Sequence, residues 1–364
     1  MIRWVNFLHI YQPPVQSAYW VKRIANECYL PVLKLLSENP EIRITINISG
    51  VLLEHFERLE MHEIFELIDK IKANRNVEFT GSAAYHPILP MLPEEEAMRQ
   101  IALNEWILEK IGGIKKPDGF FLPEMCFSQA VAEILEKMGY RWVIMDEIAC
   151  PGKISGVLGN GKLKVILRNR GVSNALNTYA LHLADLLKNF EKNEVWVSAT
   201  DGEIYGHHKK EFWQIFRELR GSNVQTLTVS EFLAEASSEA MVSARACSWA
   251  STEEELKQEI PYPRWYNRNN ELHMLQWAIT VRAFKLVKAR ENKKAREILD
   301  KAVFSCQYYW ANPGILWYPG MVVKGLKLWE RFYKECNALQ DFKPVSELLK
   351  RKLEEYQREY YGGT

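Results

Sequence analysis

Val195-Trp-Val-Ser-Ala-Thr-Asp201-Gly-Glu203-Ile-Tyr-Gly-His207-His208 is the segment around which the rest of this chain can be interpreted. Its first four residues are typical of a buried strand, and acids and histidines follow at once, as at the carboxyl end of a strand in an α/β protein. The glycines at 202 and 206 permit tight backbone conformations, so the carboxylates of Asp201 and Glu203 could be aimed into a cleft. A polar turn leading into a helix near Lys209 fits the same residues, and the rest of the chain has to decide between the two.

An acid also follows a second short apolar run, Gly119-Phe-Phe-Leu-Pro-Glu124-Met. Glu124 comes directly after Pro123, where the dipole of a following helix favours an acid, so its presence has a structural explanation. That explanation does not account for the matching acid at Asp201. Two acids at the ends of two strands therefore favour a functional site.

The composition is that of an ordinary globular protein and gives no sign of a strongly charged partner. The chain has 364 residues, 47% of them hydrophobic and 26% charged, which allows one large barrel domain with an appended part or two to three ordinary domains. A formal net charge of +1 gives no reason to expect nucleic acid or a membrane surface as a partner. The 12 Trp, 16 Tyr and 15 Phe residues suit sugar rings, so carbohydrate is the expected partner.

The six cysteines predict neither a zinc site nor a disulfide framework, because they are scattered without a paired CxxC spacing. We expect no metal and no cofactor. The short apolar run at the start is typical of a first strand rather than of a signal peptide, and no stretch is long and apolar enough to span a bilayer. A reducing cytoplasm is the expected location.

Up to about residue 230 the chain alternates strands with helices. Repeated strand, helix, strand units imply a parallel sheet with helices outside it, and about seven such units favour an incomplete (β/α)7 barrel over 1–230, although an open sheet fits the same pattern. The expected strands are 3–8, 41–49, 77–80, 119–122, 141–145, 163–167, 195–198 and 224–229. The expected helices are 20–37, 51–73, 94–111 and 129–138.

From residue 231 onward the pattern changes. No convincing alternating run follows, and apolar residues recur at helical spacing. The helices expected there are 271–290, 294–310, 322–336 and 345–360. Proline and glycine punctuate the junctions between them, as in Asn312-Pro-Gly314. We expect 231–364 to be a helical subdomain that packs on the barrel and contributes to its cleft.

Polar and aromatic side chains recur where the expected strands end. In a parallel barrel all these ends meet at one face, where active sites are built. His9 and His86 are the candidate histidines, because each lies at a strand end beside prolines that fix the backbone. Four tryptophans, Trp20, Trp142, Trp265 and Trp310, are candidates for stacking on glucose units, although core packing also explains each of them taken singly.

Taken in order, these motifs resemble those of glycoside hydrolase family 57. The resemblance covers about Val5 to Trp329 and rests on His9…Gln12-Pro13, Gly81…His86-Pro87, Phe121-Leu-Pro-Glu124 and Asp201-Gly-Glu203…Gly206. That family comprises α-glucan amylases, 4-α-glucanotransferases and branching enzymes, with an incomplete seven-stranded barrel and a helical bundle. This chain departs from the family pattern at Tyr11, where a second histidine is usual.

The resemblance also implies roles for single residues. Glu124 matches the family's nucleophile, and Asp201 matches its general acid/base. Further matches imply contacts with the sugar. Together with three of the tryptophans above, the expected substrate-binding residues are His9, Gln12, His86, Trp142, Arg168, Glu203, His207, Trp265 and Trp310.

Two carboxyl groups also fit the chemistry of glycosidic bond cleavage. The departing oxygen needs a proton and the oxocarbenium-like centre needs stabilisation, so two carboxyl groups flank the sugar. We predict a retaining reaction in which Glu124 forms a covalent glycosyl-enzyme and Asp201 transfers the proton. Hydrolysis and glucosyl transfer both use that intermediate, and these residues fit both.

Two other classes of protein stay open. His207, His208 and Asp201 are compatible with a metal-dependent carbohydrate deacetylase, although adjacent histidines on a regular helix do not share a face and no other ligand spacing is evident. A non-catalytic glucan-binding protein would carry the same motifs. Metal analysis tests the first alternative, and product analysis on a glucan tests the second.

Overall fold

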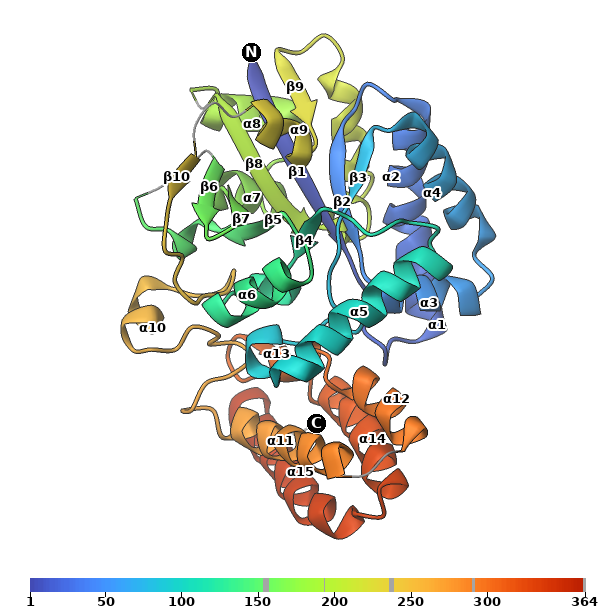
Figure 1. Ribbon diagram of the computed structural model, residues 1–364, viewed down its shortest axis with the longest axis vertical. Helices are drawn as coiled ribbons and strands as arrows, with labels where there is room; N and C mark the ends of the chain where they lie inside the picture. The colour runs from blue at the N-terminus through green and yellow to red at the C-terminus, as the bar shows by residue number, and fades with distance from the viewer. Residues whose placement is uncertain (153–156, 193, 236–238, 290–291, 363–364) are drawn as a thin grey trace. The chain divides into compact units, whose positions relative to one another are not determined.

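A computed structural model describes residues 1–152, 157–192, 194–235, 239–289 and 292–362 (Figure 1). The chain divides into two compact units. Unit 1 comprises Met1–Gln12, Gln16–Ala84 and Leu89–Trp249, and unit 2 comprises Pro13–Val15, Tyr85–Ile88 and Ala250–Thr364. Within the described ranges, no helix is both long enough and apolar enough to cross a membrane.

The first sheet of unit 1 is entirely parallel and has β1 at its centre. Its strands are β3 (Val77–Phe79), β2 (Ile44–Ile48), β1 (Ile2–Ile10), β8 (Val195–Asp201) and β9 (Val224–Leu227). Strand β8 pairs with one edge of β1, and the other edge is shared, with β9 along its first half and β2 along its second. All five residues of β2 are buried, as expected for a parallel strand covered on both faces.

The second sheet of unit 1 is parallel except for one hairpin. Its order is β10 (Glu239–Met241), β6 (Val157–Asn160), β7 (Leu163–Arg168), β5 (Trp142–Asp146) and β4 (Gly119–Phe121), and only β6 and β7 pair in antiparallel fashion. The two sheets are linked at two places. Gly81, just after β3, forms a parallel bridge with Phe120 of β4, and the backbone N–H of Asn169 donates to the carbonyl of Val197 in β8 at 2.7 Å.

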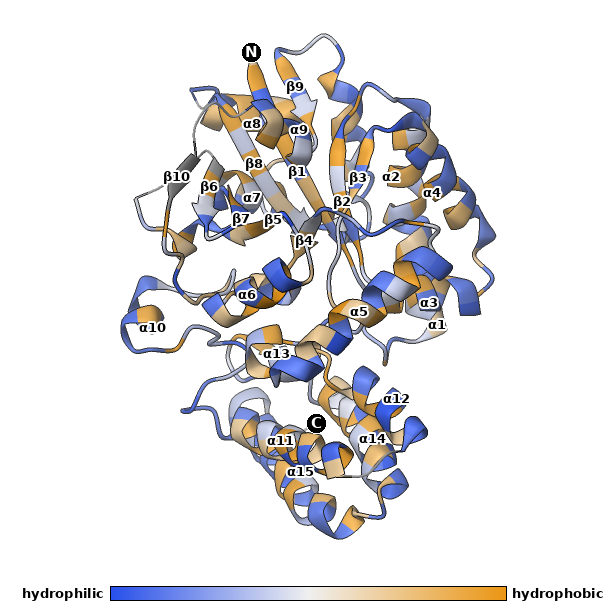
Figure 2. Ribbon diagram, viewed as in Figure 1, coloured by the Kyte–Doolittle hydropathy of each residue, from blue (hydrophilic) through white to orange (hydrophobic). Residues whose placement is uncertain are grey.

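The helices of unit 1 lie between successive strands along the chain. They are α1 (Ala18–Ile24), the π-helix η1 (Ala25–Tyr29), α2 (Leu30–Glu38), α3 (Gly50–Arg58), α4 (His62–Asn74), α5 (Glu94–Lys110), α6 (Gln129–Lys137), α7 (Arg170–Asn177), α8 (Leu183–Phe190) and α9 (Val229–Glu235). Orange and blue bands alternate along them in Figure 2. In α4, for example, Ile64, Leu67, Ile68 and Ile71 are buried, which is the spacing of one helix face.

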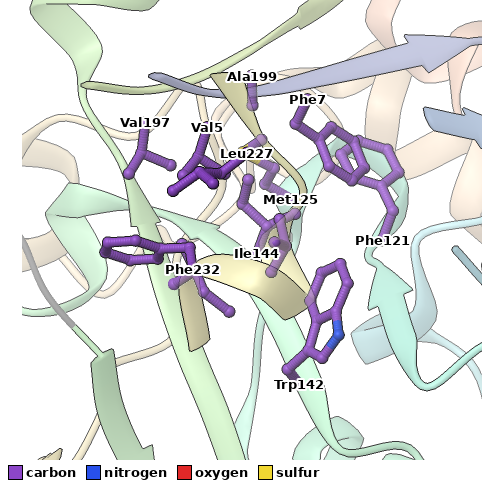
Figure 3. Close-up of a cluster of buried hydrophobic side chains, with 12 residues drawn as sticks. Val5, Phe7, Phe121, Met125, Trp142, Ile144, Val197, Ala199, Leu227 and Phe232 are labelled. Atoms are coloured by element: carbon purple, nitrogen blue, oxygen red, sulfur yellow. The ribbon is translucent and has the colours of Figure 1, made fainter. Parts of the chain in front are cut away.

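Both sheets contribute side chains to one hydrophobic cluster (Figure 3). Its members are Val5, Phe7, Phe121, Met125, Trp142, Ile144, Ile166, Val197, Ala199, Leu227, Val229 and Phe232. The rings of Phe7 from the first sheet and Phe121 from the second are stacked, with centroids 5.2 Å apart. The cluster therefore joins the two sheets through their facing side chains as well as through their edges.

Unit 2 is helical. Its helices are α10 (Glu253–Lys257), α11 (Glu271–Ala289), α12 (Lys293–Ala302), α13 (Cys306–Tyr309), α14 (Pro319–Glu335) and α15 (Leu339–Tyr361), with a two-stranded hairpin of β11 (Ala311–Asn312) and β12 (Leu316–Trp317). Helix α14 contacts α12 and α15, and α11 contacts α15. Inside, the rings of Trp277 and Tyr308 stack at 4.6 Å, and the Trp329 indole donates to Gln307 Oε1 at 2.8 Å.

The alternation of strands and helices predicted for the first part of the chain is confirmed as an α/β fold with parallel strands. The helix predicted over 51–73 is wrong in one respect, because α3 ends at Arg58 and α4 begins at His62. Glu60 in between has a φ of 55°, which no helix allows. The predicted helix 294–310 also breaks, at Val303, and the strands β10, β11 and β12 lie in the stretch where only helices were expected.

Candidate active site

The polar ends of the strands follow from the two-residue period of a strand. Successive side chains point to opposite faces, so residues two apart share a face. On β1, Phe7 belongs to the core cluster, and the next residue on the same face of the strand is His9. On β8, Ala199 belongs to the cluster, and the next residue on the same face is Asp201. The same step on β5 and β7 leads to two further polar residues, Asp146 and Arg168.

His9 and Asp201 are register partners on the neighbouring strands β1 and β8. Asp201 is exposed, whereas His9 is buried, with Nδ1 hydrogen-bonded to Asn47 Oδ1 at 2.8 Å and its ring stacked on Phe121 at 4.4 Å. Burial lowers the pKa of His9, and the nearby Asp201 carboxylate and the Asn47 hydrogen bond oppose that shift only in part. At neutral pH His9 is therefore a neutral hydrogen-bonding group beside a solvent-accessible carboxylate.

Glu124 lies in a 3-10 turn, η3 (Pro123–Met125), directly after β4. Its φ is 57° and that of Met125 is 48°, both in the left-handed region that side chains other than glycine rarely adopt. Trp249 holds this turn twice: its backbone N–H donates to the Glu124 carbonyl at 3.3 Å, and its indole N–H donates to Glu124 Oε2 at 2.9 Å. Strained residues held in this way cluster at functional sites.

Glu203 is buried beneath the exposed Asp201, in the 3-10 turn η5 (Gly202–Tyr205). Its Oε1 accepts hydrogen bonds from Gln12 Nε2 at 2.8 Å and from the hydroxyl of Tyr29. Burial, followed by the negative charge of Asp201, raises the pKa of Glu203 to about 8, and the two hydrogen bonds oppose that shift. Gln12 and Glu203 therefore bind each other, and Glu203 carries a proton over most of the neutral range.

Glu203→Gln is expected to remove a pH dependence of stability. Because the folded-state pKa of about 8 lies above the ordinary 4.5, Glu203 contributes fully to stability below pH 4.5 and loses that contribution as pH rises through 8. The amide keeps the shape but cannot ionise. Denaturant unfolding from about pH 5 to about pH 9 should show wild type losing on the order of a few kcal/mol relative to the variant. If the free energy of unfolding changed with pH in the same way in wild type and in Glu203→Gln, this prediction would be wrong.

Asp146 is the centre of a buried ion cluster at the ends of β5 and β7. It is fully buried, and its two oxygens accept from Arg168 Nε at 2.8 Å and from Arg170 Nε at 2.6 Å. Arg168 also donates to the carbonyl of Ala199 in β8 at 3.2 Å, and Arg170 donates to the carbonyl of Trp249 at 3.1 Å. The cluster therefore connects three strands with the segment that holds Glu124.

Asp146→Asn is expected to destabilise the fold by about 3–5 kcal/mol, because it leaves two buried or half-buried guanidinium groups without their carboxylate. The matched control is Asp118→Asn, which removes an exposed ion pair with Arg141 at 3.6 Å and should cost under about 1 kcal/mol. Urea unfolding of the three proteins measures both values. Equal losses in the two variants would show that the cluster contributes no more than a surface pair.

His207 is held by a hydrogen bond between its Nδ1 and the carboxylate of Glu27. Hydrogen bonds from His207 and from Arg23 lower the pKa of Glu27. Gly206 makes this approach possible, because a Cβ there would lie 1.9 Å from the carbonyl oxygen of Glu27. Among the described residues, no three His, Cys, Asp or Glu side chains are grouped as metal ligands would be.

The prediction that Trp142 stacks on a sugar is wrong. Its side chain is 1% exposed, lies within the core cluster and donates its indole N–H to Ser230 Oγ at 3.3 Å (Figure 3). This burial leaves no open ring face for a sugar to stack on. Arg168 is buried too, and its guanidinium donates to Asp146 and to the carbonyl of Ala199, so its predicted contact with substrate stays a prediction.

Three predicted site residues lie in unit 2. Trp265 is fully buried, with its ring stacked on Tyr309 at 5.6 Å, so its prediction as a sugar-stacking residue is also wrong. His86 has a φ of 58° and its Nδ1 bonds to Ser305 Oγ at 2.9 Å. Trp310 is half-buried, edge-on to Phe304. Unit 1 holds the remaining predicted site residues: His9, Gln12, Glu124, Trp142, Arg168, Asp201, Glu203 and His207.

Two residues of the site escape sequence reasoning. Trp249 lies 125 positions from Glu124, outside every motif, and no local pattern marks it. Tyr29 lies in a helical stretch where an aromatic residue predicts only core packing, yet its hydroxyl bonds to Glu203. Asp146, by contrast, carries the available signal, since it is an acid directly after a predicted strand.

Comparison with known proteins gives a family and several relatives. The model of glycosyl hydrolase family 57 matches residues 6–245. An α-amylase of Pyrococcus horikoshii is 31% identical over 146 residues, which cover 39% of this chain and 23% of that protein. A 4-α-glucanotransferase of Thermococcus litoralis is 25% identical over 146 residues, which cover 39% and 22%. The chain thus spans about a quarter of the length of the curated relatives it matches.

Solved structures show the same fold at lower identity. A GH57-type branching enzyme from Pyrococcus horikoshii superposes with a TM-score of 0.72 and 17% identity, covering 99% of this chain and 95% of that one. The 4-α-glucanotransferase of Thermococcus litoralis gives a TM-score of 0.74 and 19% identity, covering 91% and 59%. At such identities the superpositions establish a shared fold alone.

Proposed function

This chain belongs to glycosyl hydrolase family 57, and from that premise we propose that it acts on α-1,4-glucan or maltooligosaccharides by a retaining mechanism. Glu124 is the nucleophile and Asp201 the general acid/base. The observation that supports this best is that His9 lies next to both the segment that carries Glu124 and the strand that carries Asp201. Its ring stacks on Phe121, three residues before Glu124, and its backbone is the register partner of Asp201.

The proposed substrate class is inferred from the activities that the relatives' names state. They include α-amylases, 4-α-glucanotransferases and a branching enzyme, and a chain of α-linked glucose units is the substrate that these names share. The exposed Asp201 agrees with a site open to a polymer. The net charge of +1, which gives no reason to expect nucleic acid or a membrane surface, is compatible with it as well.

The scaffold of this site is an incomplete barrel of seven parallel strands, β1, β2, β3, β4, β5, β7 and β8. The bridge between Gly81 and Phe120 and the hydrogen bond between Asn169 and Val197 support closure at both junctions of the two sheets. The single cluster of apolar side chains from both sheets supports it too. In such a barrel unit 1 is the catalytic unit.

In the first chemical step, a carboxylate oxygen of Glu124 forms a bond to the anomeric carbon of a glucose unit. The bond from that carbon to the glycosidic oxygen breaks, and the oxygen takes the proton of Asp201. A retaining pair of carboxyl groups stands about 5 to 5.5 Å apart in the reacting complex. Neutral His9, held by Asn47, is placed to hydrogen-bond the sugar next to Asp201.

In the second step, Asp201 removes a proton from an incoming hydroxyl, whose oxygen bonds to the anomeric carbon. The bond to Glu124 breaks and the carboxylate is restored. When the hydroxyl belongs to water the reaction is hydrolysis, and when it belongs to another glucan chain the reaction is transfer.

Incubation with maltotriose, followed by sizing of the products, tests the proposal. Shorter products alone indicate a hydrolase, and longer chains indicate a glucanotransferase. A protein that binds maltotriose and leaves it intact would be a non-catalytic glucan-binding protein, and that result would overturn the proposed activity.

A further inference from the structure

We propose that Trp249 is the positioning residue for Glu124: its indole N–H fixes one carboxylate oxygen and thereby sets the orientation of the whole carboxylate toward the sugar. This inference rests on the proposed function, since it assigns a role in that reaction. The indole nitrogen lies 2.9 Å from Oε2 of Glu124, within the range of a good hydrogen bond. A bond to one oxygen of a carboxylate restricts rotation of the whole group, so the direction of Oε1 is set as well.

The segment that carries Trp249 is fixed against the turn that carries Glu124. Cys247 and Phe127 exchange two backbone hydrogen bonds, of 2.8 and 3.3 Å, and form an antiparallel bridge. The N–H of Trp249 then donates to the carbonyl of Glu124. Trp249 is therefore tied to the turn by its backbone on one side and by its indole on the other, and this pairing holds the left-handed backbone of Glu124 in place.

The same segment is anchored on the buried ion cluster of unit 1. Arg170 donates Nη2 to the carbonyl of Trp249 at 3.1 Å and Nε to the fully buried Asp146 at 2.6 Å. The ring of Trp249 packs against the core cluster, so it is held in place by apolar contacts as well. Glu124, Trp249, Arg170 and Asp146 thus form a continuous chain of hydrogen bonds from the surface-accessible site to the interior.

Trp249→Phe is the direct test, because phenylalanine keeps an aromatic ring against the core cluster and removes the N–H donor together with part of the ring. We expect kcat on maltotriose to fall by about 100-fold with KM unchanged, since misplacing a reacting atom by roughly 1 Å has that effect. The matched control is Trp196→Phe, which removes another buried indole donor, bonded to the carbonyl of Phe190 at 3.0 Å. We expect Trp196→Phe to lose similar stability and to keep the kcat of wild type.

A second measurement separates positioning from general damage. Glu124→Gly suits the left-handed backbone at that position and removes the carboxylate, whose place azide can take as an external nucleophile. Azide nitrogen then bonds to the anomeric carbon, and the leaving oxygen takes the proton of Asp201. We then compare the rate of Glu124→Gly with that of the double variant Glu124→Gly/Trp249→Phe, both with and without azide. The two rates should differ by less than about twofold, because no carboxylate remains to be positioned.

The outcomes distinguish this inference from the function it rests on. A wild-type protein that leaves maltotriose intact overturns the proposed function and the inference with it. An active wild type with an unchanged kcat in Trp249→Phe overturns the inference alone. A loss of equal size in the wild-type and Glu124→Gly backgrounds, or a loss confined to KM, does so too, because Trp249 would then act on the fold or on the sugar.

Discussion

Glu124→Gln is expected to lower the turnover of maltooligosaccharides by at least about 1,000-fold while the protein stays folded. Glutamine keeps the length and the hydrogen-bonding oxygen of the side chain, so the indole N–H of Trp249 retains its acceptor. The amide, however, cannot form the ester bond to the sugar that the reaction requires. The folded state is checked by unfolding curves, and turnover by release of shorter or longer products from maltotriose.

The type of substrate sharpens this test. An α-glucosyl fluoride carries a leaving group that needs no proton. Its reaction with the enzyme therefore requires no general acid in the first step but still requires a nucleophile. We therefore expect Glu124→Gln to stay inactive on the fluoride. Turnover near that of wild type on either substrate would remove Glu124 from the role of nucleophile.

The fold class could be predicted from sequence because the signal is local. Alternating apolar residues mark β2, and helical spacing marks α4, whatever surrounds them. The break between α3 and α4 was missed because both helices bury the same residue types at the same spacing, so nothing but the backbone at Glu60 interrupts the pattern. The short strands β11 and β12 have only two residues each, too few to show a period.

The residues of the candidate site also fall into two groups: those that a local sequence pattern predicts and those that depend on long-range packing. His9, Asp146 and Asp201 follow strands and can be located by counting in steps of two from apolar residues. The difference between Trp142 and Trp249 depends on long-range packing: the first is enclosed by side chains from both sheets, and the second meets a carboxylate far away in the sequence. Residue type and local pattern are the same for a core tryptophan and a tryptophan that serves a site.

Asp201 and Glu203 show most clearly how far the site can be predicted from sequence, because both are acids of one motif. The two-residue step along β8 brings Asp201 to the open end of the strand, where it is exposed, and the turn after it directs Glu203 into the interior. Sequence suggests two similar carboxylates aimed at a cleft. The structure separates an accessible one from a buried one that holds a proton and binds Gln12 and Tyr29.

Asp201→Asn is expected to reduce turnover of maltotriose by about 100-fold to 10,000-fold, because asparagine can neither give a proton to the leaving oxygen nor take one from water. Asp201 is exposed at the end of β8, so the substitution should leave stability almost unchanged. Asp118→Asn, which changes an exposed acid of a surface ion pair, is the control and should keep full activity.

The decisive measurement uses substrates that bypass one proton transfer at a time. With an α-glucosyl fluoride the first step needs no acid, so Asp201→Asn should form the glycosyl-enzyme rapidly and then stall, since no base activates water. Azide needs no deprotonation, so its addition should restore turnover and release a glucosyl azide of retained configuration. This pattern is the opposite of that expected for Glu124→Gln, which stays inactive on the fluoride. If Asp201→Asn responded to neither the fluoride nor azide, its carboxyl group would not be the one that transfers the proton.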